Sequence, residues 1–122
     1  MRGIVLQYAN LRNAILDGSN MANTNLKNAN LAVALLENTN LQHASLENAM
    51  LNGADFKKAN LVGAVLTNAT VSHTNFIEAN LCGADMRCIG LETAKWGNTK
   101  YNSETIWLDS FEPQTSGLIK QD

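Results

Sequence analysis

The sequence is poor in the features that many classes of protein require. Aromatic residues make up 6% and charged residues 16% of its 122 positions, and the formal net charge is −2. A nucleic-acid-binding protein carries a basic stripe, so this balance argues against nucleic acid as a partner. No run of apolar residues is long enough to span a membrane, so we expect no membrane partner either.

Cysteine and histidine are also scarce: Cys82, Cys88, His43 and His73 are the only ones. A zinc site needs about four ligands within tetrahedral reach, so we expect no metal, no cofactor and two surface thiols. Phosphate-binding glycine loops and the Gly-x-Ser-x-Gly elbow are missing too, which predicts a protein that is not an enzyme. The N-terminal residues lack the apolar segment of a secretory signal, so we expect a cytoplasmic location.

What the chain has in abundance is a five-residue repeat. A large apolar residue, usually Leu, stands at every fifth position from Leu6 to Leu91, and a small residue, usually Ala, precedes it by two positions. Asn or Asp is the commonest residue between the two, as in Ala29-Asn30-Leu31. We predict that the large residues form the core, with these as its central members: Leu26, Leu31, Leu36, Leu41, Leu46, Leu51, Phe56, Leu61, Leu66, Phe76 and Leu81.

A period of five excludes a continuous helix or a continuous strand. On an α-helix, five steps of about 100° turn the side chain by roughly 140°, so the leucines would form no stripe. On a strand, an odd period sends successive leucines to opposite faces. A short extended stretch followed by a corner does fit, because the small and the large residue then share one face. Asn and Gly are common at the remaining positions, and both tolerate the left-handed backbone that a corner needs.

The motif Ala-Asn/Asp-Leu-x-x, as in Ala54-Asp55-Phe56, Ala59-Asn60-Leu61 and Ala79-Asn80-Leu81, resembles the pentapeptide-repeat family over residues 4–91. The resemblance implies an all-β fold, a right-handed quadrilateral β-helix in which one pentapeptide forms each side. Coils of about twenty residues would stack at the strand spacing of about 4.8 Å, giving about five coils. One interior column would then contain Leu16, Leu36, Phe56, Phe76 and Trp96.

The repeat also predicts how the chain is divided. We expect residues 1–95 to form the β-helix and residues 96–122 to form a C-terminal cap with a loose tail from Gln114 onward. Solenoid ends need caps because they expose core and unpaired backbone. The segment from Tyr101 to Pro113 is similar to the tails of many cyanobacterial family members, which implies a cyanobacterial source. No comparable cap opens the chain, so a homodimer and a preceding segment both remain open.

Two groups of outward residues are candidates for a binding surface. Asn20, Asn40, Asn60 and Asn80 would form an uncharged column, whose amides either hydrogen-bond along the rod or present a flat docking face. Ile15, Leu35 and Val33 would form an apolar patch nearer the N-terminus, of the kind that marks interfaces.

These observations favour a non-catalytic structural and interaction scaffold that binds an unknown protein partner. The family resemblance implies one alternative, a DNA-mimicking inhibitor or protector of a type II topoisomerase such as gyrase. A DNA mimic requires a strongly acidic surface, and the net charge of −2 argues against it.

Overall fold

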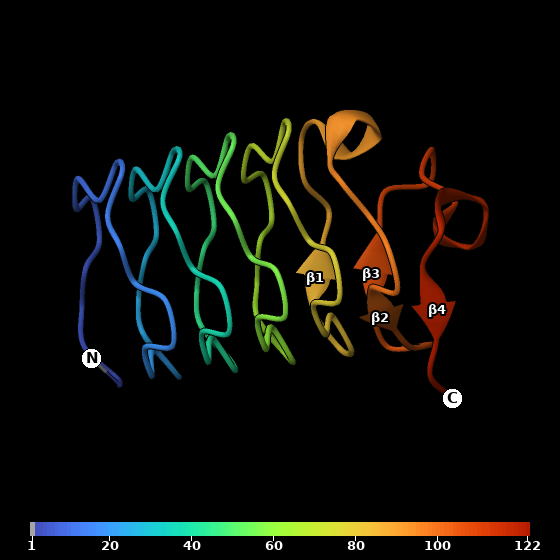
Figure 1. Cartoon of the computed structure of the whole chain (residues 1–122), viewed down its shortest axis with the longest axis horizontal. Coiled ribbons are helices and arrows are strands. Elements are labelled where there is room, and N and C mark those ends of the chain that lie inside the picture. The colour runs from blue at the N-terminus through green and yellow to red at the C-terminus, as the bar shows by residue number, and fades with distance from the viewer. Residues whose placement is uncertain (1) are drawn as a thin grey trace.

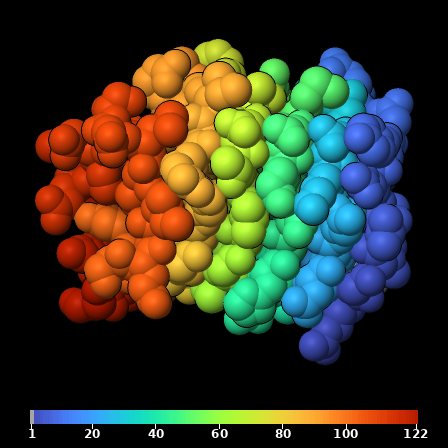
Figure 2. Space-filling view, turned by 180° about the vertical axis from the view of Figure 1, so that it is seen from behind, coloured from blue at the N-terminus to red at the C-terminus, as the bar shows by residue number. Residues whose placement is uncertain are grey.

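The computed structural model describes residues 2–122, and it shows a rod of stacked coils with the two termini at opposite ends (Figure 1). Parallel bridges join residues twenty positions apart, from Val5 with Asn25 to Asn80 with Lys100. In the space-filling view, segments far apart in the sequence form adjacent bands across the rod (Figure 2). This arrangement is a repeat β-helix, built almost entirely from isolated bridges and turns.

Each pentapeptide between Leu6 and Ala84 closes with the same turn. The N–H of Ala29 donates to the carbonyl of Leu26 at 3.1 Å, and Asn28, the third residue of that turn, has a φ of 60°. A positive φ at the third position alone is the pattern of a type II turn, which favours Gly and Asn there. The frequent Asn and Gly at every fifth position therefore set the corners of the coil.

The interior is filled by the side chains that the period points inward. All eleven residues predicted for the core have 0% exposed surface, and the small residues beside them, such as Ala44 and Ala64, are equally buried. Burial of each leucine contributes about 1.5–3 kcal/mol. Near the C-terminal end the rings of Phe56 and Phe76 stack at 5.7 Å, and those of Phe76 and Trp96 at 5.1 Å.

The coil register slips once. Thr70 pairs with Ile89, nineteen positions away, and Cys88 fills the place of a small inward residue. Gly90 has a φ of 94°, and a Cβ there would collide with Ser72. The 3-10 helix η1 (Leu91–Thr93) then takes up the missing residue, and the twenty-residue spacing returns downstream.

Short strands and aromatic rings cover the C-terminal end. Strand β1 (Asp85–Met86) pairs in parallel with β3 (Ile106–Trp107), and β2 (Lys100–Tyr101) pairs in parallel with β4 (Ile119–Lys120). A second 3-10 helix, η2 (Pro113–Ser116), lies between β3 and β4.

The tail from Gln114 onward was expected to be loose, and that expectation is wrong for its last part. The N–H of Ile119 donates to the carbonyl of Thr99 at 2.8 Å, and Leu118 is buried. The aromatic rings beneath this tail pack together as well, with Trp107 stacked on Phe111 at 4.8 Å. The tail is ordered because it continues the parallel ladder by one further pairing.

The filled interior makes a charge there costly. We predict that Leu41→Asp lowers the free energy of unfolding by about 4 kcal/mol or more, because it removes a buried side chain and places a carboxylate among apolar groups. Urea unfolding followed by circular dichroism measures the change. Gln42→Asp, at the adjacent half-buried corner position, should shift stability by less than about 1 kcal/mol. An unaltered unfolding midpoint for Leu41→Asp would contradict the inward placement.

Candidate interaction surface

The asparagines between the inward residues support the turns that follow them. Asn40 Oδ1 accepts the N–H of Gln42 at 3.0 Å, and Asn60 Oδ1 accepts that of Val62 at 3.0 Å. Asn20 and Asn80 make the same bond to the residue two positions on. These contacts are local to each turn, so the oxygens of the predicted Asn column serve the backbone of their own coil.

One contact does run along the rod, where Asn75 Nδ2 donates to Asp55 Oδ1 at 3.2 Å. Another column, Asn28, Asn48 and Asn68, occupies left-handed corner positions, with φ values of 60–62°. Asn is therefore used in two ways, as a turn acceptor on the flat sides and as a left-handed residue at the corners.

Several positions of the flat sides hold an apolar residue in place of this acceptor, namely Val5, Ile15, Leu35, Met50 and Val65, and two of them face each other in adjacent coils. Ile15 and Leu35 occupy the place of Asn in adjacent coils, bridge to each other and are 76% and 41% exposed. Neither side chain can accept the N–H of the following turn. The N–H of Glu37 bonds instead to Oδ1 of Asp17 in the preceding coil, at 3.0 Å. The sequence thus gives up a local hydrogen bond to expose two apolar side chains.

Val33 adds backbone strain to the same region. Its φ is 58°, and it is the one β-branched residue with a positive φ in the part of the chain that the structure describes. A β-branched side chain is a genuine outlier in this conformation, which Asn or Gly occupies at most of the other corners. Val33 is 46% exposed, so no interior packing accounts for it. We call Ile15, Val33 and Leu35 the apolar patch.

The reactive side chains are dispersed. His43 and His73 occupy exposed left-handed corners thirty positions apart, and so lie on different corners of the coil. Cys82 is half-buried. Cys88 was predicted at the surface, and that prediction is wrong, because the register slip turns it inward and leaves it 1% exposed. The sequence does carry a signal of this slip. The repeat predicts a small residue at position 89, but Ile stands there and the small residue is Cys88.

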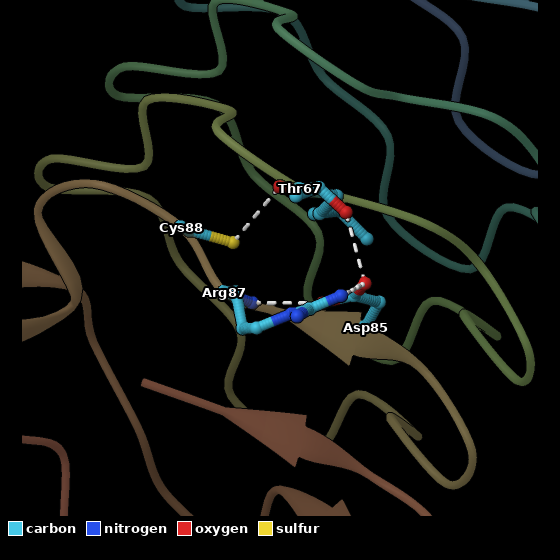
Figure 3. A network of polar contacts seen from close by, with 5 residues as sticks. Thr67, Asp85, Arg87 and Cys88 are labelled. Atoms are coloured by element: carbon cyan, nitrogen blue, oxygen red, sulfur yellow. Dashed lines mark hydrogen bonds and ion pairs between the residues drawn. The ribbon is translucent and has the colours of Figure 1, made fainter. Parts of the chain in front are cut away.

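A polar network surrounds Cys88 (Figure 3). Its thiol donates to the carbonyl of Leu66 at 3.3 Å, and burial raises its pKa to about 12. Asp85 lies nearby. Its carboxylate accepts a hydrogen bond from Arg87 Nη2 at 2.7 Å and another from the Thr67 hydroxyl at 2.9 Å. These bonds, chiefly that from Arg87, lower the pKa of Asp85. The network stabilises the slipped coil, and burial keeps the Cys88 thiol protonated at neutral pH.

Two shallow pockets lie on the surface of residues 2–122. One of about 480 Å³ lies between the slipped coil and the C-terminal segment, against Ile89, Leu108 and Phe111. Another of about 400 Å³ follows the column of Gly63 and Gly83. Within residues 2–122 no cluster of three potential metal ligands occurs, and no helix has the length and apolar character needed to cross a membrane.

The parallel bridges and filled interior define the protein as a repeat β-helix. Its sequence matches the pentapeptide repeats in 8 copies, over residues 2–32, 34–68 and 64–88. The chain therefore belongs to the pentapeptide repeat family. A comparison with curated proteins gives no match.

Two solved structures, HetL and QnrB1, show the same fold. HetL, a pentapeptide repeat protein from Nostoc sp. strain PCC 7120, aligns with a TM-score of 0.69 and 24% identity over 86% of this chain and 49% of HetL. This chain thus spans about half the length of HetL. Trypsin-treated QnrB1 aligns with a TM-score of 0.59 and 15% identity, over 93% of this chain and 65% of QnrB1. The Nostoc protein alr5209 is 27% identical over 92% of this chain and 84% of its own length, with a TM-score of 0.48.

Relief of the strain at Val33 should stabilise the protein. We predict that Val33→Asn raises the free energy of unfolding by about 1 kcal/mol and the melting temperature by about 4 °C. Asn48→Val, the converse change at an equivalent exposed corner, should lower stability by a similar amount. Calorimetry of both variants measures the pair of shifts. A loss of stability in Val33→Asn would show that the valine makes a compensating contact.

Burial of the Cys88 thiol should govern its reactivity and its pH dependence. At pH 8 a thiol reagent should modify Cys82 alone in the native protein and both cysteines in urea, as mass spectrometry can read. The folded-state pKa of Cys88 lies above its ordinary value of 9.0, so stability holds below that pH and falls as pH rises toward 12. Cys88→Ala should show a smaller decline over this range. Equal native labelling of both thiols would contradict the inward placement.

Proposed function

We propose that this chain is a non-catalytic scaffold that binds a partner protein through the apolar patch. The observation that carries the proposal is Val33, an exposed β-branched residue held at a strained corner. Strain persists at sites where it serves function, and here it places an apolar side chain beside Leu35 and Ile15. Exposed apolar groups of this kind are typical of protein interfaces.

The absence of catalysis is part of this proposal, and the filled interior supports it. Enzyme active sites use concave, partly water-excluded pockets in which ionisable groups converge. In this fold the inward positions hold apolar side chains without exposed surface, and most of the ionisable groups lie on convex corners. Such corners suit contact with another protein better than they suit enclosure of a substrate.

The finer architecture belongs to the proposal as well. We infer a right-handed, four-sided β-helix of about five coils, since four bridging residues fall within each interval of twenty. The division into a β-helix over residues 1–95 and a cap over 96–122 is supported by the aromatic rings that close the C-terminal end. We also propose a cytoplasmic location and a cyanobacterial source. The structural similarity to HetL from Nostoc supports the proposed source.

A topoisomerase-directed DNA mimic is the second candidate. QnrB1 is described as a plasmid-mediated fluoroquinolone resistance protein, and it shares the fold of this chain. The corner charges here alternate in sign, however, with Lys27 Nζ 3.8 Å from Glu47 and Lys58 Nζ 3.9 Å from Glu78. A surface of mixed sign gives little resemblance to the phosphates of a duplex. The scaffold proposal therefore expects no inhibition of gyrase in a supercoiling assay.

The patch can be removed without loss of fold. We predict that the double variant Val33→Asn, Leu35→Asn is at least as stable as the natural chain, because it relieves a strained corner and restores a turn acceptor. It should lose at least tenfold in affinity for a partner captured by the immobilised natural chain from an extract of the source organism.

Titration calorimetry with the purified partner measures that affinity, and Ile106→Asn, an exposed apolar position near the other end, serves as the matched control. Equal affinities for the natural chain and the double variant would remove the patch as the binding surface.

A further inference from the structure

The first coil carries backbone groups without partners. In the coils after the first, each bridging residue bonds to the coil before it. The N–H of Asn25, for example, donates to the carbonyl of Ile4 at 3.0 Å, and its C=O accepts the N–H of Leu6 at 2.7 Å. The backbone N–H and C=O of such a residue therefore both point toward the N-terminal end of the rod. Val5, Asn10, Ile15 and Asn20 hold the same position in the first coil. Within the described chain, their backbone N–H and C=O groups have no such partner. We call these four residues the N-terminal edge.

The side chains at this end are exposed and apolar. Val5, Tyr8 and Ile15 are 70%, 72% and 76% exposed. Tyr8 also has a φ of 65°, an unusual conformation for a bulky residue. The opposite end differs, because Trp96, Trp107 and Phe111 pack over it and β4 extends its ladder. Within residues 2–122, aromatic rings cover one end of the rod, and the backbone groups of the N-terminal edge are unpaired at the other.

We propose that the N-terminal edge binds a second copy of this chain, head to head about a two-fold axis perpendicular to the rod. Such an axis makes the chain directions antiparallel where the two edges meet. In an antiparallel ladder, the residues of each hydrogen-bonded pair exchange both of their N–H···O bonds. Within residues 2–122, Val5, Asn10 and Ile15 each carry an unpaired N–H and an unpaired C=O, and Asn20 carries an unpaired N–H, so the two edges can satisfy each other. A head-to-tail contact would have to displace β4.

The corner charges of the first coil select the orientation. Arg2, Arg12 and Asp17 each precede a left-handed residue, so they stand at three of its corners, and Tyr8 stands at the fourth. A two-fold axis through two opposite flat sides places each Asp17 beside an arginine of the other copy and each Tyr8 beside the other arginine. The second contact suits a cation–π interaction.

An axis through two opposite corners is disfavoured, because it brings like charges together. An axis through the Tyr8 and Asp17 corners would place Asp17 beside Asp17 of the second copy, and Arg2 beside Arg12. An axis through the two arginine corners would place each arginine beside the same arginine of the second copy. Charge complementarity of this kind fixes the register of an interface more than its affinity. Two arrangements remain: an axis through the Val5 and Ile15 sides, which pairs Asp17 with Arg12, and one through the Asn10 and Asn20 sides, which pairs Asp17 with Arg2.

Light scattering over a concentration series tests the proposal. The natural chain should show a reversible shift toward twice the monomer mass as concentration rises, and Val5→Lys should remain a monomer. Asp17→Asn keeps the side-chain oxygen that accepts the N–H of Glu37, and it should weaken dimerisation severalfold. Ile106→Lys, which changes an exposed apolar residue near the covered end, should leave the mass unchanged.

Disulfide trapping in a Cys82→Ser background tests the orientation, since directly opposed residues lie within disulfide reach. Cross-linking of Val5→Cys with itself supports the axis through the Val5 and Ile15 sides. Cross-linking of Val5→Cys only with Ile15→Cys supports the other axis.

A monomer at every concentration, or a dimer that Val5→Lys leaves intact, would overturn the proposal. The light-scattering variants Val5→Lys, Asp17→Asn and Ile106→Lys leave Ile15, Val33 and Leu35 unchanged, so their outcome can be distinguished from that of the test of the apolar patch.

Discussion

The left-handed residue at every fifth position is the constraint on which the remainder of the structure depends. It lets the chain turn after each short extended stretch, so that a residue such as Leu41 and the small residue two positions before it face the same axis. The turn also aligns the N–H and C=O groups of successive coils, whose bonds measure 2.7–3.1 Å along the bridged sides. Without the turn, a period of five would bury no continuous surface.

The filled interior then determines where function can lie. Inward positions must hold side chains that fit a narrow axis, so they vary little, and most chemical variety appears on the flat sides and corners. On those surfaces Asn and Gly are the choices that favour folding, since they serve as turn acceptors or accept a positive φ. An apolar residue at such a position gives up stability, and this cost is the reason for our proposal that Ile15, Val33 and Leu35 form an interaction surface.

Much of this arrangement follows from the sequence, because the repeat fixes the direction of each side chain. The burial of Leu26 and the stacking of Phe56 on Phe76 agree with positions assigned by period alone. The burial of Cys88 was not predicted from the sequence. The coil is one residue shorter before Ile89, and η1 adds that residue back, so the spacing of the large apolar residues is unchanged. The ordered tail was missed for another reason: β4 forms by pairing with a distant strand, and its own sequence carries no repeat.

The parallel ladder is paired differently at the two ends of residues 2–122. At the C-terminal end, large rings fill the space that another coil would occupy, so the ladder ends on Trp107 and Phe111 and on the short pairing of β4. At the other end, the free groups of Val5 and Ile15 retain the geometry that every interior coil uses to bind its neighbour. The two ends differ in both backbone and side chains, because β4 pairs with β2 at the C-terminal end while the backbone groups of Val5 and Ile15 are unpaired within residues 2–122. Within residues 2–122, the side chains at the two ends therefore differ in kind: packed aromatic rings lie at the C-terminal end, and exposed apolar and charged residues lie along the N-terminal edge.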